Sequence, residues 1–216
     1  MLKILKGQED LFKGIIVCDV SGNTSPLPFL LHFLATATSA NEKVAIVTSR
    51  SSELSYRLIC SKAGVRWAHA QVEFIELLPP FKSLRVCAKE LMHDGLLKIQ
   101  KSGATAVLFD DLSLLEHFGA DPIEVTLFVH QLYSDLKKSS ESVLVYAPFC
   151  SSASTKLLLR RRCNVYIQLV PVGHGFGKEA TAKALLSIKS AGGCTQKKGI
   201  LLSGERAING TWMATV

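Results

Sequence analysis

Short runs of consecutive apolar residues alternate along the chain with longer segments of helical periodicity. Continuous apolar runs of this length are typical of strands that are buried on both faces of a parallel sheet. The runs span residues 14–20, 43–49, 105–111, 142–148 and 164–172, with a weaker one at 72–78. Strands that alternate with helices predict right-handed crossovers, so we expect an α/β fold with a mostly parallel central sheet and helices on both faces.

The segments between these runs carry the signals that begin and end helices. The expected helices span residues 26–40, 51–64, 83–103 and 122–138, with a short helix or turn at 151–162. Pro26 falls in a first turn, where proline is tolerated, and Asp121 is an expected N-cap. Gly64 stands where a helix commonly ends. After residue 172 glycines bound short segments of mixed alternation, which predicts an antiparallel hairpin or meander at one edge of the sheet.

Composition indicates a soluble, intracellular, globular protein of one domain over residues 1–216. The chain is 48% hydrophobic and 20% charged, which is typical of a folded domain. No apolar run approaches the roughly 20 residues of a membrane span, and the mixed charges of the N-terminus do not form a secretory signal. The six cysteines form no CxxC pair, so we expect free thiols and no metal site. We expect a cytoplasmic location, and a nuclear location in addition is the alternative.

The first loop after a strand, at residues 19–25, is where a phosphate-binding loop would lie. Ligands of such sheets bind at the carboxyl ends of the strands, and a phosphate-binding loop there reads GxxxxGK[ST]. Here the strand continues as DVSGNTSPLP, with Gly22 but no GK[ST] and no lysine between residues 14 and 42. Phosphoryl transfer needs that cation, so we expect no complete ATPase site and no cofactor in this chain.

A second glycine-rich stretch, GHGFGKE at residues 173–179, is one residue short of the phosphate-loop spacing. Glu179 also stands where serine or threonine would hold magnesium. We expect a turn between two late strands, and a contact from Lys178 to a phosphate or a nucleic-acid backbone is the alternative.

The apolar run 105–111 ends in Asp110 and Asp111, like a degenerate Walker B strand. Without a phosphate-binding loop these acids have no magnesium nucleotide to act on, so we favour a role in capping the turn. Asp110 or Asp111 could be combined with Ser113 and His117 into a hydrolase triad by residue type alone. The G-x-S-x-G signature is absent, and we expect no nucleophilic catalysis.

The chain carries a net charge of +7, which favours acidic partners such as nucleic acid. Its densest basic run is Arg160, Arg161 and Arg162, preceded by Lys156. Guanidinium groups bind phosphates in bidentate fashion, and a solvated run is the alternative. Aromatic residues make up only 7% of the chain, so any nucleic-acid recognition would depend on charge and shape more than on stacking.

Two segments resemble the Elongator complex protein 6 family. They are VLFDDLSLLEHFGADPIEVTLFVHQL at 107–132 and VPVGHGFGKEATAKALLSI at 170–188. The resemblance implies a single RecA-like domain that lacks a phosphate-binding loop. It also implies a ring built with two other RecA-like Elongator subunits, two copies of each. That ring binds tRNA and supports wobble-uridine modification, while the chemistry resides in the catalytic Elongator subcomplex.

The resemblance makes the chain a non-catalytic accessory subunit, with the loops 112–121 and 148–155 facing a central channel and the arginine run near RNA. Three alternatives remain open at this point. The chain could resemble Elongator subunit five instead. It could be a nucleotide-dependent ATPase or transferase that uses a non-standard loop at 19–25 with Asp110 and Asp111. It could also be a RecA paralogue that acts on DNA.

Overall fold

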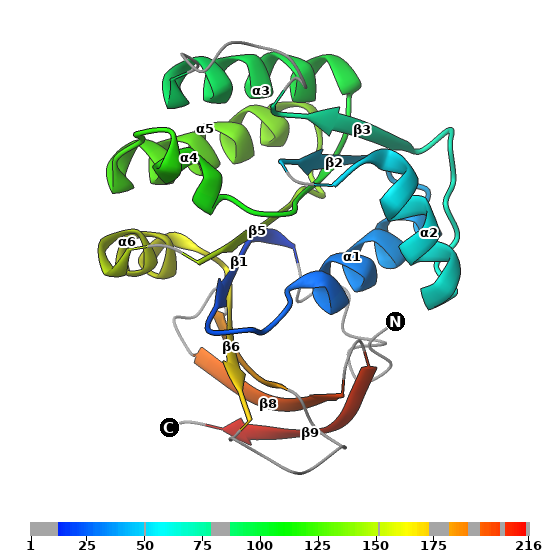
Figure 1. The fold of residues 1–216 in the computed structure, drawn as a ribbon, viewed down its shortest axis with the longest axis vertical. Coiled ribbons are helices and arrows are strands. Elements are labelled where there is room, and N and C mark those ends of the chain that lie inside the picture. The colour runs from blue at the N-terminus through cyan, green and yellow to red at the C-terminus, as the bar shows by residue number, and fades with distance from the viewer. Residues whose placement is uncertain are drawn as a thin grey trace.

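A single nine-stranded sheet runs through the computed structural model of the chain (Figure 1). The structure describes residues 13–49, 51–78, 87–150, 152–172, 182–189, 195–203 and 206–214, the last of these by its backbone alone. The strand order is β3-β2-β4-β5-β1-β6-β7-β8-β9. The strands are β1 (Gly14–Val20), β2 (Val44–Thr48), β3 (Val72–Glu76), β4 (Ala106–Phe109), β5 (Leu144–Phe149), β6 (Val165–Pro171), β7 (Ala182–Lys189), β8 (Thr195–Ser203) and β9 (Arg206–Ala214).

The sheet is parallel from β3 through β6 and antiparallel from β6 through β9. β5 lies between β1 and β4, so Asp19 of β1 and Asp110, which directly follows β4, are separated by one strand. This arrangement confirms the expected mostly parallel sheet and the antiparallel C-terminal edge.

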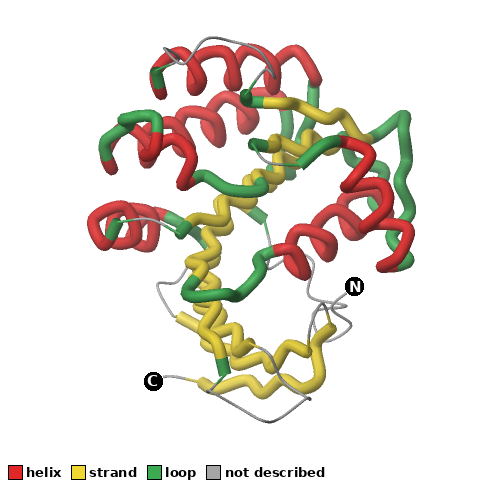
Figure 2. Tube along the Cα trace, in the orientation of Figure 1, coloured by secondary structure: helices red, strands yellow, loops and turns green. Residues whose placement is uncertain are grey.

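Helices cover both faces of the sheet (Figures 1 and 2). The helices are α1 (Leu27–Ser39), α2 (Glu53–Ala63), α3 (Ala88–Ser102), α4 (Ser113–His117), α5 (Pro122–Ser139) and α6 (Ala153–Arg162). Two hydrophobic cores lie on the two faces of the sheet. In one core the strand residues of one face pack against α1 and α2, and in the other core the strand residues of the opposite face pack against α3, α4, α5 and α6. The fold is therefore a three-layer α/β arrangement, as the alternating pattern predicts.

β1 shows why a continuous apolar run predicts a strand in the middle of such a sheet. Its residues are all buried. Ile15 and Val17 belong to the core under α3 to α6, and Ile16 and Cys18 belong to the core under α1 and α2. Because successive side chains of a strand point to opposite faces, a strand with two covered faces is apolar at nearly every position. Asp19 is the one charged residue of β1.

Local signals fix the ends of several helices where the sequence places them. Asp121 caps α5 by accepting from the backbone N–H groups of Ile123 and Glu124, and the Glu124 carboxylate accepts from the Asp121 N–H in return. α2 ends at Ala63, and its C-cap Gly64 has a φ of 68°. Left-handed backbone of this kind favours glycine.

α4 and the exact start of α3 differ from the sequence expectation. α4 has only five residues, which is too short to display helical periodicity, so no helix was expected there. α3 begins at Ala88 and not at residue 83, and residues 79–86 lie outside the described part. The expected short helix or turn at 151–162 is the helix α6, of ten residues.

No helix in the described ranges is long and apolar enough to cross a membrane.

Candidate functional site

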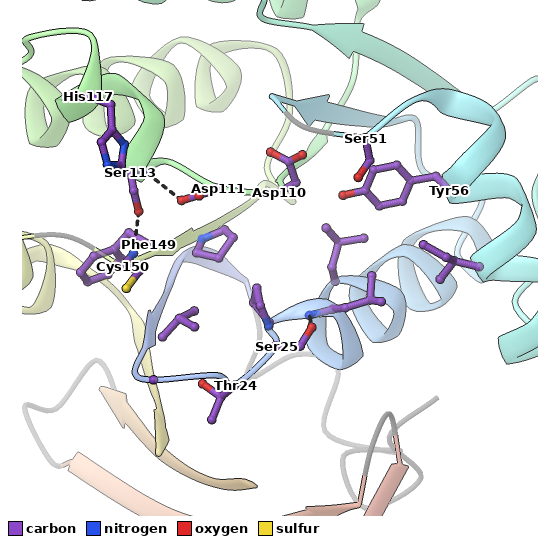
Figure 3. A pocket seen from close by; sticks show the side chains of 17 residues that line it. Thr24, Ser25, Ser51, Tyr56, Asp110, Asp111, Ser113, His117, Phe149 and Cys150 are labelled. Atoms are coloured by element: carbon purple, nitrogen blue, oxygen red, sulfur yellow. Dashed lines mark hydrogen bonds between the residues drawn. The ribbon is translucent and has the colours of Figure 1, made fainter. Parts of the chain in front are cut away.

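A hollow lies at the carboxyl ends of β1, β4 and β5, where ligands of open α/β sheets bind. It has a volume of about 560 Å³. Its wall comes from the loop after β1, the first residues of α1, α2 and the segments after β4 and β5 (Figure 3). Its polar side chains are Thr24, Ser25, Ser51, Tyr56, Asp110, Asp111, Ser113 and His117. No described residue of this wall is a lysine or an arginine.

The loop after β1 forms a tight turn in place of a phosphate cradle. The Ser21 carbonyl accepts from the Thr24 hydroxyl at 2.8 Å and from the Thr24 N–H at 3.4 Å. Gly22 has a φ of 58°. Pro26 precedes α1 and Pro28 lies in its first turn, so two backbone N–H groups that could face an anion are missing from this helix start.

Asp110 joins the end of β4 to the end of β2. Its carboxylate accepts from the Thr48 hydroxyl at 2.6 Å, from the Ser49 hydroxyl at 3.0 Å and from the Ser49 N–H at 3.0 Å. Burial raises the pKa of the neighbouring Tyr56 phenol, and the charge of Asp110 raises that pKa further. These contacts tie the segment after β4 to the end of β2.

Asp111 and Ser113 organise the segment that leads into α4. Asp111 accepts from the Ser113 N–H at 2.8 Å, and the Ser113 hydroxyl accepts from the Cys150 N–H at 2.6 Å (Figure 3). Ser113 is buried, so its hydroxyl serves to connect this segment to the end of β5. His117 lines the same hollow, and no described hydrogen bond joins it to Ser113.

Glu116 fixes the start of α6, a contact that sequence reasoning missed. Its carboxylate accepts from the Ser152 N–H at 3.3 Å, from the Ser152 hydroxyl at 3.4 Å and from the Thr155 hydroxyl. A carboxylate at a helix N-terminus is stabilised by the helix dipole. α4 thereby positions α6 and, with it, the basic run at the end of that helix.

Lys156 of α6 forms an ion pair with Asp19 of β1. The distance from the Lys156 ammonium to the Asp19 carboxylate is 2.7 Å, and the Tyr166 hydroxyl donates to the other carboxylate oxygen at 2.8 Å. Asp19 is only 4% exposed, so the ammonium offsets a buried negative charge. Burial raises the pKa of Tyr166, and its hydrogen bond to Asp19 raises that pKa further.

The predicted nucleic-acid-binding arginines lie at the surface, at the C-terminal end of α6. Arg160, Arg161 and Arg162 are exposed, and the Arg160 guanidinium lies 5.2 Å from the centre of the Tyr166 ring. Lys189 of β7 donates to the carbonyls of Arg160 and Arg161, both at 2.9 Å. The structure thus brings the arginine run together with a lysine that the sequence did not single out.

Lys178, the remaining predicted contact, lies outside the described residues with the whole stretch 173–179. The described ranges also contain no group of three or more His, Cys, Asp or Glu residues that could hold a metal ion.

Comparison with protein-family models found no family that matches this chain, and comparison with curated proteins found no match either.

Proposed function

We propose that this chain is a non-catalytic subunit of the Elongator complex. In this proposal it forms a hetero-hexameric ring with two other RecA-like subunits, and the ring binds tRNA and supports wobble-uridine modification by the catalytic subcomplex. The single observation that carries the proposal is the hollow at the strand ends. It occupies the position of a nucleotide site in such folds, yet its described wall has two aspartates and no cation.

The topology supports a RecA-like domain. The strand with the degenerate Walker B acids, β4, is separated from β1 by β5, and the sheet continues through β6 into three antiparallel strands. The loop between β1 and α1 then stands where a phosphate-binding loop would be expected. A parallel core with an antiparallel C-terminal edge is the architecture that the family resemblance implies.

The contacts of the two acids support an accessory role. Asp110 is engaged with Thr48 and Ser49, and Asp111 with the Ser113 backbone. The described wall of the hollow offers no lysine or arginine to the negative charge of a triphosphate. These contacts are those of residues that hold loops in place.

Exposed apolar side chains support assembly with other subunits. Leu54 and Leu58 of α2 are 66% and 56% exposed, and Ile123 and Leu127 of α5 are 60% and 58% exposed. Each pair is spaced i, i+4, so its two members lie on one side of their helix. Apolar residues gathered on an exposed surface are typical of protein interfaces.

The proposal is tested by the modification state of tRNA. Deletion of this chain from its native cells should remove the modified wobble uridines, measured by mass spectrometry of tRNA nucleosides. Re-expression of the wild-type chain, and equally of an Asp111→Ala variant, should restore them because the acid has no catalytic task. Wobble uridines that stay modified after deletion would contradict the proposal. So would a failure of the Asp111→Ala variant, expressed at the wild-type level, to restore modification.

A further inference from the structure

One face of the antiparallel edge is basic and lies next to the end of α6. We define the basic sheet face as Arg160, Arg161, Lys183, Lys189 and Lys197. All five residues are exposed. In Figure 1 the edge strands β8 and β9 lie at the opposite end of the sheet from α3, beyond α6.

The three lysines share one side of β7 and β8. Along β7 the residues that pack into the core with α1 are Ala182, Ala184, Leu186 and Ile188. Lys183 and Lys189 alternate with them and therefore point to the other side. Lys197 of β8 is paired with Ser187 of β7, so it lies on that same side. Six residues along a strand place Lys183 and Lys189 roughly 20 Å apart.

Lys189 connects this row to the arginine run. Its ammonium donates to the last carbonyls of α6, those of Arg160 and Arg161. A cation at this position complements the negative end of the helix dipole. The contact holds the end of α6 beside β7, so the arginines lie next to one end of the lysine row.

The described strands of this surface carry no negative charge. From residue 163 onward the described ranges contain neither aspartate nor glutamate. Asp19, which contacts Lys156 of α6 and Tyr166 of β6, is buried, and the Lys156 ammonium offsets its charge. The face is therefore complementary to a polyanion.

The surface also has no described aromatic platform for unpaired bases. Tyr166 is the aromatic residue beneath it, but this side chain is only 6% exposed, lies under the Arg160 guanidinium and donates to Asp19. Single-stranded nucleic acids usually bind on exposed aromatic rings. Double-helical RNA is instead recognised by shape and by contacts to phosphates and 2′-hydroxyls.

We propose that the basic sheet face binds the phosphate backbone of double-helical RNA, such as a stem of tRNA. This inference rests on the nucleic-acid part of the proposed function and is independent of the ring. The RNA-binding residues lie on β7, β8 and the end of α6. Lys156 does not contact the RNA directly, because its ammonium forms an ion pair with Asp19.

The test is fluorescence anisotropy of a labelled RNA duplex of about 16 base pairs, titrated with the full chain over a series of salt concentrations. The test variant carries R161E, K183E and K197E, and it leaves Lys189 in place because that residue supports α6. Reversal of three contacting charges should weaken duplex binding at least about tenfold and reduce the slope of log K against log salt by about two to three. The neutral variant R161Q/K183Q/K197Q should also lose duplex affinity and salt dependence, but less than the charge-reversed variant.

The matched control variant carries K43E, K62E and K101E, which make the same change in net charge at exposed positions. It should bind the duplex within about threefold of the wild type, since only residual long-range charge effects remain. Circular dichroism of each variant confirms the fold.

Two results would overturn the inference. One is equal weakening by the test and control variants while the wild type binds. The other is tighter binding of a poly(U) strand of the same length than of the duplex. In both cases the proposed tRNA function survives. If neither the wild-type chain nor its native assembly binds tRNA or the duplex, the nucleic-acid part of the proposed function fails as well.

Discussion

The ammonium of Lys156 lies 2.7 Å from the carboxylate of Asp19 and joins α6 to the end of β1. The Tyr166 hydroxyl holds the second carboxylate oxygen at 2.8 Å. A helix, the middle of the sheet and the start of its antiparallel edge therefore meet at one buried acid. This arrangement assigns Lys156 a structural task.

Substitution of Lys156 should cost stability and leave RNA binding largely unchanged. Lys156→Ala leaves the Asp19 charge buried without its partner, which should lower the free energy of unfolding by about 1–3 kcal/mol. Urea unfolding followed by circular dichroism measures this change. The double variant Lys156→Ala with Asp19→Asn should recover part of the loss because the buried charge is gone. Unchanged stability of Lys156→Ala together with lost RNA binding would contradict the structural role.

The two neighbouring aspartates should differ in their effect on stability. Asp110→Ala removes an acceptor from two hydroxyls and a backbone N–H, so it should cost about 2 kcal/mol. Asp111→Ala removes the acceptor of the Ser113 N–H and should cost about 1 kcal/mol. Chemical denaturation of the two variants gives both values. A larger loss of unfolding free energy for Asp111→Ala than for Asp110→Ala would show that the hydrogen bonds of Asp110 contribute less to stability than the structure indicates.

Magnesium nucleotides should not stabilise the isolated chain. A ligand that binds only the folded state raises the midpoint of thermal unfolding. The described wall of the strand-end hollow offers no cation to a triphosphate, so millimolar ATP with magnesium should raise the Tm by less than about 1 °C. A clear rise that disappears in Asp111→Ala would support the rival interpretation as a nucleotide-dependent enzyme.

Stability should fall at alkaline pH because of buried thiols. Burial raises the pKa of Cys18 to about 12 and the pKa values of Cys60 and Cys163 to about 11. The unfolded chain releases these protons near pH 8.5, whereas the folded chain keeps them. The stabilisation is therefore complete below about pH 8.5 and is lost as the pH rises toward 11.

A single substitution isolates this thiol contribution. Cys60→Ala removes one of the titrating groups, so its free energy of unfolding should fall less steeply above pH 9 than that of the wild type, by up to about 1 kcal/mol per pH unit. Urea unfolding at pH 8, 9 and 10 compares the two slopes. Parallel slopes would show that Cys60 ionises in the folded chain as readily as in the unfolded one.

Much of the fold could be predicted because its signals are local. β1 is apolar at every position but Asp19 since both of its faces are covered, and the capping box at Asp121 and Glu124 lies within one helical turn. α4 could not be predicted, because its five residues are too few for a periodic pattern.

The contacts that build the candidate site are less accessible to sequence reasoning because their partners are distant. Asp19 bonds with Tyr166, 147 residues away, and Glu116 with Thr155, 39 residues away. Asp19 was visible only as an acid near the end of an apolar run. Only the topology shows that α6 crosses above it and places Lys156 within reach.

The central claim is tested most directly by the partners of the chain. A tagged copy should be purified from its native cells and its stoichiometric partners identified by mass spectrometry. We expect two further RecA-like chains in equal amounts, together with the large subunits of the Elongator complex. Recovery of the chain alone, or with DNA-repair factors, would contradict its assignment to Elongator.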